Sequence, residues 1–312
     1  KKVVDIGCAT GILSMFAARG GADVVVGVDG AADIAAVARA NIAHAGLNDK
    51  VSVVQGKVEE LLAAGDIPGA GTFDVLVSEW MGYALLYESM LDTVLAARDK
   101  LLKPGGAVLP DIATIHVAGF SRNATSLPFW DDVYGFQMPT VQSSLLRDAV
   151  KAAVVCPLKG KHVVTTSAMV QSLDLATMTV ADTEFSSAEY VLTARDDGVR
   201  GDEVDEEVKA GSGEGATGLT QPGAEAHSES GGGDGPVMCY GIVLWFDTPF
   251  SERFCKEESV VLSTSPYVKQ THWAQTMLHF PEPVALLPAA GGGTDASGAS
   301  GALGSRENPA AG

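Results

Sequence analysis

The chain has 312 residues, 46% of them hydrophobic, and its 39 acidic side chains outnumber 21 Lys and Arg to give a net charge of −18. Nucleic acids are bound by neutralising phosphates with Lys and Arg, so this charge argues against a nucleic-acid partner and favours basic peptides. Because no apolar run could span a bilayer, no signal segment is present and the four cysteines form no close pair, we expect a soluble protein of a reducing compartment with no membrane partner.

The first predicted elements are a buried strand, a glycine turn and a helix. The strand covers residues 3–6, the turn is Gly-Cys-Ala-Thr-Gly at residues 7–11, and the helix begins at Ile12. Glycine lets the backbone approach a ligand closely. The turn lacks the full Gly-x-Gly-x-x-Gly pattern, which weakens a dinucleotide interpretation. Many doubly wound folds have such a turn merely for close packing of helix on strand.

Two further strands add polar residues to the same predicted crevice. Residues 22–28 end in Asp29, and an acid at that strand end can reach ribose hydroxyls. Residues 51–55 lead into Gly56-Lys57-Val58-Glu59-Glu60. Three strand ends then converge, which favours a nucleoside site. Glu59 can accept a hydrogen bond from an adenine amino group, although an acid in a first helical turn is equally favoured by the helix dipole.

The segment from Ser78 to Met90 is the most informative in the chain. Glu79 follows the apolar strand 73–78, at the end of a parallel strand where ligands bind. The helical spacing of Met90-Leu91 and Val94-Leu95 predicts that Glu88 opens a helix and folds back towards Glu79. Two carboxylates so placed can hold a planar guanidinium, and Arg fits them better than Lys. The alternative is a pair of surface acids on a loop.

The second half of the chain changes character near residues 109–110, where helices and strands stop alternating. Short strands at 114–118, 163–166, 240–246 and 276–280 predict an antiparallel barrel-like domain that walls a substrate groove. The fold class is therefore α/β: a doubly wound domain at 1–118, a barrel-like domain at 119–288, and a Gly/Ala-rich tail at 289–312. The acidic stretch at 195–236 is interpreted as a disordered insertion, either a solvated loop or an attractor of basic substrates.

Several segments together carry a resemblance to a known family. Residues 78–90 resemble the double-glutamate loop of type I protein arginine N-methyltransferases, and Thr271-His272-Trp273 resembles their Thr-His-Trp loop. The turn at 7–11, Asp29 and residues 56–60 are similar to the family's cofactor motifs. The resemblance extends from residue 1 to about Pro283. Residues 109–115, 129–136 and 185–187 look most like the arginine methyltransferase 3 branch.

The resemblance implies a Rossmann-like domain that binds S-adenosylmethionine and an enzyme that forms mono- and asymmetric dimethylarginine in proteins. The implied catalytic residues are Glu79, Glu88 and His272. The implied cofactor contacts are Asp5, Gly7, Cys8, Thr10, Gly11, Asp29, Gly30, Val58, Glu59, Glu79 and Met90. The implied substrate contacts are Trp80, Met81, Tyr83 and Trp273. Met90 would limit the geometry of the second methylation, or is a core residue.

The family also implies partners and a location. Residues 121–150, with Trp130, Tyr134, Phe136 and Met138, resemble a dimerisation arm, so we expect a homodimer. Substrates would be Arg-rich proteins such as a ribosomal protein or histones, in the cytoplasm and also the nucleus. The scattered histidines and cysteines indicate no metal site.

Two other functions stay open. Helices that precede the first strand in the family normally cover the cofactor and pair an acid with this histidine, and this sequence starts at Lys1. A catalytically impaired homologue acting as a dimerising scaffold is therefore the alternative, and it predicts no stabilisation by the cofactor. A small-molecule methyltransferase would not need Glu79, Glu88 and the Thr-His-Trp loop together.

Overall fold

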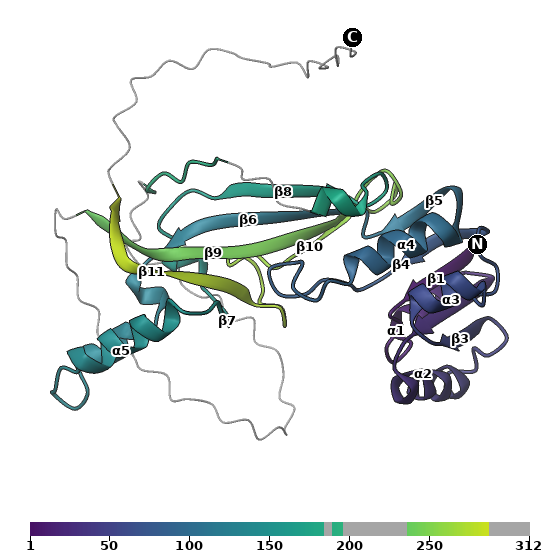
Figure 1. Cartoon of the computed structure of the whole chain (residues 1–312), viewed down its shortest axis with the longest axis horizontal. Coiled ribbons are helices and arrows are strands. Elements are labelled where there is room, and N and C mark those ends of the chain that lie inside the picture. The colour runs from purple at the N-terminus through teal and green to yellow at the C-terminus, as the bar shows by residue number, and fades with distance from the viewer. Residues whose placement is uncertain (184–188, 196–235, 287–312) are drawn as a thin grey trace, which may run out of the picture.

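The computed structural model describes residues 1–183, 189–195 and 236–286, and Figure 1 shows a parallel and an antiparallel sheet joined end to end. The expected insertion at 195–236, the tail at 289–312 and the segment 185–187 lie wholly or almost wholly outside the described residues. No helix among the described residues is long and apolar enough to cross a membrane.

The parallel sheet has five strands in the order β3-β2-β1-β4-β5. They are β1 (Lys2–Ile6), β2 (Val24–Asp29), β3 (Val51–Gln55), β4 (Phe73–Val77) and β5 (Leu102–Leu109). The helices between them are α1 (Ile12–Arg19), α2 (Ala32–His44), α3 (Val58–Ala64) and α4 (Leu91–Leu101). The strand order reverses direction next to β1, and the carboxyl ends beside β1 and β4 are where such sheets bind ligands.

Apolar side chains on both faces of this sheet explain the two helical layers. Val3, Val25 and Val51 pack with Ala18 of α1 and Ile42 of α2. The neighbouring residues of the same strands point the opposite way. Val4, Val26 and Leu76 pack with Val58 of α3 and Leu95 of α4. The expected doubly wound arrangement is therefore confirmed.

The antiparallel sheet has six strands in the order β7-β11-β9-β6-β8, with β10 also paired to β9. They are β6 (Ile112–Phe120), β7 (Val154–Cys156), β8 (Ala168–Asp174), β9 (Val237–Phe250), β10 (Val260–Ser263) and β11 (Gln275–Leu286). Among the described residues no strand pairing closes it into a barrel, and the segment expected as a strand at 163–166 makes only isolated bridges at Val163 and Thr165.

The two sheets meet at the chain crossing from β5 to β6. β5 ends at Leu109 and β6 begins at Ile112, so the sheet changes earlier than the domain boundary expected at residue 118, which falls inside β6. One apolar core continues across the junction: Leu76 and Leu95 of the first sheet's layer belong to the same cluster as Ile115 and Phe246 of the second.

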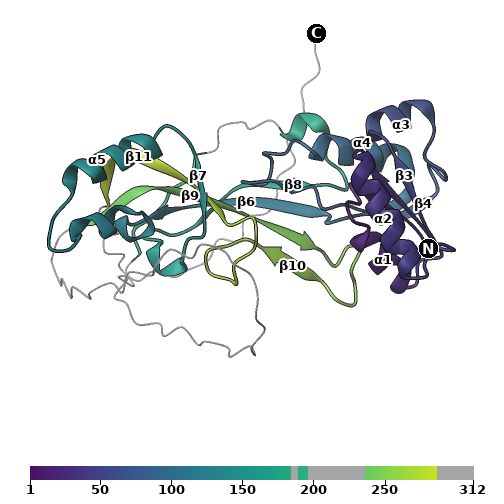
Figure 2. The ribbon, with the colours of Figure 1, turned by 90° about the horizontal axis from the view of Figure 1, so that it is seen from below.

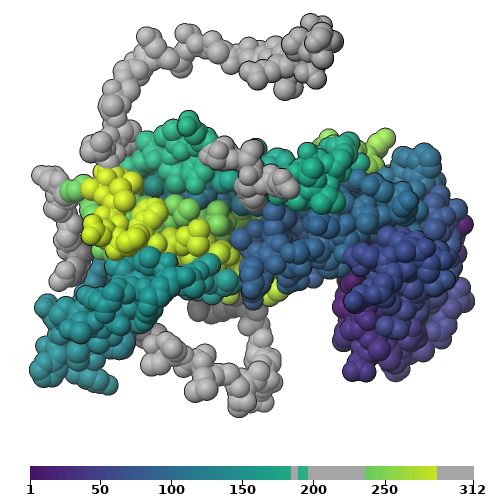
Figure 3. Space-filling view, viewed as in Figure 1, coloured from purple at the N-terminus to yellow at the C-terminus, as the bar shows by residue number. Residues whose placement is uncertain are grey.

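The segment expected to be an arm leaves the far end of the antiparallel sheet. It contains η1 (Arg122–Ala124), η2 (Leu127–Asp131) and α5 (Pro139–Ala149), and Figure 3 shows it projecting from the body in teal. Two more short helices, η3 (Gly160–His162) and η4 (Val180–Thr183), complete the described chain. Seen from below in Figure 2, α5 and the parallel sheet lie at opposite ends of the molecule.

Candidate active site

The glycine turn after β1 is shaped by hydrogen bonds to the neighbouring strand. The N–H groups of Gly7 and Cys8 both donate to the carbonyl of Val28, at 2.9 and 3.0 Å, and Gly11 donates to the carbonyl of Cys8 at 2.7 Å. Gly7 has φ +72°, and a Cβ there would lie 2.5 Å from the Met90 Cε. The left-handed φ favours glycine at residue 7, and the absence of a side chain leaves room for the end of the Met90 side chain beside the turn.

Asp29 is fixed by two backbone N–H groups. Its Oδ2 accepts from Ala9 and its Oδ1 from Ala31, each at 2.9 Å. The carboxylate thus joins the glycine turn to the start of α2 and keeps lone pairs for a further donor. Ala9 has φ +46°, a left-handed conformation that is strained for Ala.

Glu59 lies in the first turn of α3, with its side chain exposed. The Thr93 hydroxyl of α4 donates to its Oε1. This hydrogen bond, together with one from the backbone, lowers the pKa of Glu59. The lowered pKa favours the ionised carboxylate, which is a stronger hydrogen-bond acceptor for an amino group than the neutral acid is. The adjacent Val58 is buried, and Gly30 is exposed at the start of the loop after β2.

The two acids of the loop after β4 are brought together by Gly82. A Cβ on Gly82 would lie 2.7 Å from the Glu88 nitrogen and 2.8 Å from its Cγ, so only glycine permits this contact. Gly82 and Leu85 exchange backbone hydrogen bonds of 3.0 Å that close the loop. α4 begins at Leu91, so the prediction that Glu88 opens the helix is wrong. The acid lies in a turn whose Ala84, Leu85 and Ser89 have positive φ.

The Thr-His-Trp loop from the antiparallel sheet completes the site. The Trp273 indole N–H donates to the carbonyl of Met81 at 2.7 Å, which ties this loop to the acid loop. The His272 ring lies against the Trp273 ring at a centroid distance of 3.8 Å. Partial burial raises the pKa of Glu79, the charge of His272 opposes that rise, and the Glu88 carboxylate adds to it. Glu79, Glu88 and His272 therefore interact electrostatically.

Other residues expected to touch a ligand are buried. Trp80, Met81 and Trp273 are 2%, 5% and 8% exposed, so their side chains pack the loops against the core and offer a peptide little surface. Only Tyr83, of the four expected substrate contacts, is well exposed, and its ring lies 6.4 Å from that of Tyr87.

Asp5 is also placed behind the crevice, not in it. It has no exposed surface, and the Ser14 hydroxyl of α1 donates to its Oδ2 at 2.6 Å. The Cys8 side chain is likewise buried, and burial raises the pKa of its thiol to about 12. These side chains support the turn, whereas Thr10 is exposed beside it.

The described residues contain no cluster of three or more His, Cys, Asp or Glu that could hold a metal. Sequence reasoning missed Thr93, which orients Glu59, and the Met81 carbonyl, which receives the Trp273 indole. No pattern in the chain signals either residue, because both bonds depend on how separate elements pack.

A doubly wound domain with a nucleoside-type crevice, followed by an antiparallel domain that supplies a histidine beside two glutamates, is the arrangement of a methyltransferase with an attached antiparallel domain. Residues 3–106 match the profile of a methyltransferase domain, and residues 111–291 match the arginine methyltransferase oligomerization subdomain. The chain belongs to the protein arginine methyltransferase family.

Similar curated proteins and solved structures support the same family assignment. The chain is 44% identical to a probable protein arginine N-methyltransferase 3 from Oryza sativa, over 91% of this chain and 42% of the relative. It is 36% identical to protein arginine N-methyltransferase 1 from Saccharomyces cerevisiae, over 90% of this chain and 67% of that relative. A Trypanosoma brucei PRMT1 enzyme-prozyme complex with AdoHcy matches at TM-score 0.67 and 33% identity, over 92% of this chain and 75% of that chain.

The higher identity to the relatives named 3 confirms the expected branch of the family. The chain spans about two fifths of the length of these relatives.

Proposed function

We propose that this chain transfers methyl groups from S-adenosylmethionine to guanidinium nitrogens of arginines in proteins, giving monomethylarginine and asymmetric dimethylarginine. One observation carries the proposal: Glu79, Glu88 and His272 interact across two loops that the Trp273 indole ties together. Two carboxylates beside a cradle for a nucleoside suit a cationic acceptor and would not be needed for a neutral one.

The residues present fit this cofactor. Asp29 keeps lone pairs for ribose hydroxyls, Glu59 is an ionised acceptor for an amino group, and the turn at Gly7 and Gly11 gives close backbone approach. The Trypanosoma brucei relative is a complex with AdoHcy, the product that remains after methyl transfer, which supports the same choice. When bound, S-adenosylmethionine supplies an electrophilic methyl group on a sulfonium.

The chain's own groups then have separate tasks. Glu79 and Glu88 hold the guanidinium and concentrate electron density on the nitrogen to be methylated, because a free guanidinium keeps its proton at pH 7. Met90, beside Gly7, limits the space around that nitrogen. The displaced proton goes to a carboxylate or to His272 acting with one. Positioning supplies much of the acceleration.

A test of the activity uses labelled S-adenosylmethionine and a Gly-Arg-rich peptide. We expect transfer by the unmodified chain and a loss of at least about 100-fold in Glu79→Gln and Glu88→Gln, since each removes one charge that holds the guanidinium. Cofactor affinity, measured by calorimetry, should be retained in Glu88→Gln. Equal loss of cofactor binding and transfer in Glu88→Gln would contradict its role as a substrate-holding acid.

We also propose that the chain forms a homodimer through the arm. Support comes from the match to an oligomerization subdomain and from the arm's exposed aromatic rings: Phe129, Tyr134 and Phe136 are 54%, 99% and 68% exposed. Such rings are typical of interfaces. Sedimentation should show a dimer that dissociates in Tyr134→Ser/Phe136→Ser. A dimer unaffected by these changes would place the interface elsewhere.

A chain that dimerises yet neither binds the cofactor nor transfers methyl groups would have the alternative function, that of a dimerising scaffold.

A further inference from the structure

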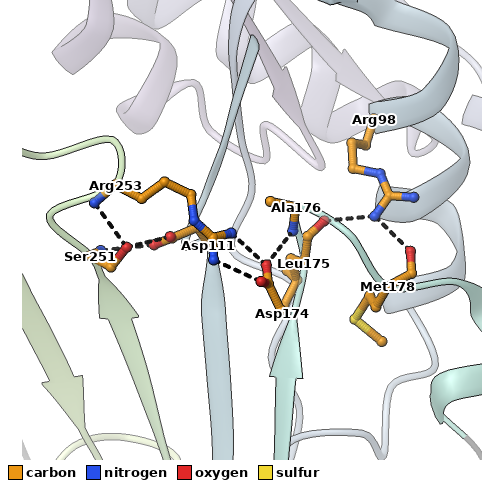
Figure 4. Close-up of polar contacts among 8 residues, drawn as sticks. All are labelled: Arg98, Asp111, Asp174, Leu175, Ala176, Met178, Ser251 and Arg253. Carbon is orange, nitrogen blue, oxygen red and sulfur yellow. Dashed lines mark hydrogen bonds and ion pairs between the residues drawn. The ribbon is translucent and has the colours of Figure 1, made fainter. Parts of the chain in front are cut away.

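A polar network joins helix α4 to the antiparallel sheet (Figure 4). Nη1 of Arg98 donates to the carbonyl of Leu175 at 2.7 Å and to that of Met178 at 2.8 Å. The other side of the same guanidinium contacts the Asp99 carboxylate at 2.7 and 2.8 Å. The Arg98 side chain is only 11% exposed, so its hydrogen bonds to the segment 174–178 are largely shielded from water.

The segment 174–178 is held from its other side by the loop after β9. Nη1 and Nη2 of Arg253 pair with the two carboxylate oxygens of Asp174, at 2.6 and 2.7 Å. The N–H of Ala176 donates to the same carboxylate at 3.0 Å. This bidentate geometry restricts both position and orientation of the segment. The segment therefore lies between an arginine of each domain.

The joint between the two sheets belongs to the same network. Asp111, which starts the crossing into β6 and has no exposed surface, accepts from the N–H of Ser251 at 2.8 Å and from its hydroxyl at 2.5 Å. The carbonyl of Asp111 accepts from the N–H of Leu175 at 2.8 Å. The Ser251 hydroxyl also accepts from the Arg253 N–H at 3.2 Å.

Helix α4 belongs to the domain that carries the two acids, whereas the histidine comes from the antiparallel-sheet domain. It packs beside β1, β4 and β5 of the parallel sheet, its buried Leu91, Val94 and Leu95 lie in the core that both sheets share, and it begins three residues after Glu88. His272 comes from the antiparallel sheet, where Trp273 packs edge-on against Phe246 of β9 at 5.5 Å. The separation of Glu88 from His272 therefore depends on two connections: the Trp273–Met81 hydrogen bond between the loops, and the attachment of α4 to the antiparallel sheet.

We propose that Arg98 is a positioning residue for methyl transfer: by holding α4 to the carbonyls of Leu175 and Met178, it sets the separation between Glu79, Glu88 and His272. This inference rests on the proposed function. Arg98 contacts none of the groups assigned to cofactor or substrate. The cofactor groups Gly7, Asp29 and Glu59 all lie in the domain that α4 belongs to, so they keep their mutual geometry when Arg98 is lost.

The kinetic test uses Arg98→Met, which keeps the aliphatic stem without its donors, and Arg98→Lys, which keeps the charge. We expect kcat/KM for a Gly-Arg-rich peptide to fall about 10- to 100-fold in Arg98→Met and to recover in part in Arg98→Lys, because small displacements of reacting groups are costly. The affinity for S-adenosylmethionine, by calorimetry, should stay within about twofold.

The matched control is Arg39→Met. Arg39 donates from Nε and Nη2 to the carbonyl of Val53, at 3.3 and 3.1 Å, and both residues lie in the parallel-sheet domain. Its loss removes a similar arginine–carbonyl contact without touching the joint, so kcat/KM should be unchanged. Unchanged kcat/KM in Arg98→Met, measured below its melting temperature, would overturn the proposal. A loss matched by weaker cofactor binding would overturn it equally.

A second measurement needs no activity. Hydrogen exchange of residues 82–89 and 271–275 should be faster in Arg98→Met and in Arg253→Met than in the unmodified chain or in Arg39→Met. The double variant should exchange no faster than the faster single variant, because both arginines act through the segment 174–178. If the unmodified chain transfers no methyl group, the proposed function fails, but the hydrogen-exchange test of Arg98 can still be made. Unchanged exchange of both segments in Arg98→Met would overturn the role proposed for Arg98.

Discussion

Glu79 is a carboxylate whose ionisation depends on side chains from two distant parts of the chain. Burial raises its pKa, the charge of His272 lowers it, and the Glu88 carboxylate raises it again. Only the ionised form holds a guanidinium, so kcat/KM should decline towards acid pH at a pH above the ordinary pKa of glutamate. Removing the imidazole in His272→Asn should move this decline to still higher pH, because the side chain that lowers the pKa of Glu79 is then gone.

A carbon-13 NMR titration of the Glu79 carboxyl group checks this without relying on the rate of methyl transfer. His44→Asn, on α2, serves as the control and should leave the titration where it is in the unmodified chain. A Glu79 pKa that stays the same or falls in His272→Asn would show that the two side chains do not interact as the structure indicates.

Asp5 gives a prediction about stability. Burial raises its pKa from 3.8 to about 6, against the lowering effect of the Ser14 hydrogen bond. The folded state therefore holds a proton that the unfolded state releases between these pH values. Stability from this group is complete below the unfolded pKa and is lost as pH rises through about 6, by about 3 kcal/mol.

Asp5→Asn removes this titration. Between pH 4 and pH 8 the unmodified chain should lose up to about 3 kcal/mol of stability that Asp5→Asn does not lose, so the free energy of unfolding of the variant should increase relative to that of the unmodified chain. Urea unfolding at both pH values measures the difference. A gap between the two proteins that does not change with pH would mean that Asp5 titrates alike in the folded and unfolded chain.

At the scale of elements, the acid loop depends on one glycine. In Gly82→Ala, the new Cβ would meet the Glu88 backbone at 2.7 Å, and backbone cannot yield as a flexible side chain does. We expect kcat/KM for the peptide to fall about 10- to 100-fold through displacement of Glu88, with a loss of about 1–3 kcal/mol in stability.

Gly46→Ala is the control that separates a loss of activity from a loss of stability. Gly46, after α2, has φ +67° and nothing within 4 Å of its Cβ position, so Ala there costs about 1 kcal/mol of stability through backbone strain alone. Its kinetic constants should be unchanged. Peptide kinetics measure the effect of both variants on activity, and thermal melts measure their effect on stability. Equal kinetic constants in Gly82→Ala and the unmodified chain would show that Gly82 is not needed to place Glu88.

The sequence predicted the strands that carry the site because their signals are local. Apolar runs bounded by glycine marked β1, β3 and β4, and Asp29 and Glu79 fell at strand ends as expected. The turn at Glu88 could not be predicted, since helical spacing fixes the face of α4 but not its start, and Ala84, Leu85 and Ser89 carry no signal for positive φ. The Trp273 indole donates to the carbonyl of Met81, which lies 192 positions away in the sequence, so no local pattern could predict where this side chain lies.

At the scale of the whole molecule, the two sheets share one core. Apolar residues from both domains, among them Leu76, Leu95, Ile115, Phe246 and Trp273, form a single cluster. The Trp273–Met81 hydrogen bond and the network around Asp111 cross the same junction. Separating the domains would expose this core to water, which is unfavourable at about 25 cal/mol per Å². Neither domain is therefore expected to unfold while the other stays folded.

Scanning calorimetry tests this coupling. The described core predicts one transition for both domains, with equal calorimetric and van't Hoff enthalpies. S-adenosylmethionine, whose proposed contacts all lie in the parallel-sheet domain, should raise the midpoint of that whole transition, because a ligand stabilises every part that unfolds with its site. Trp273→Phe keeps the ring and loses the donor to Met81, so it should lower stability by about 1–3 kcal/mol, leaving a buried carbonyl unpaired. Two separate transitions, only one of them moved by the cofactor, would show that the junction does not couple the two domains.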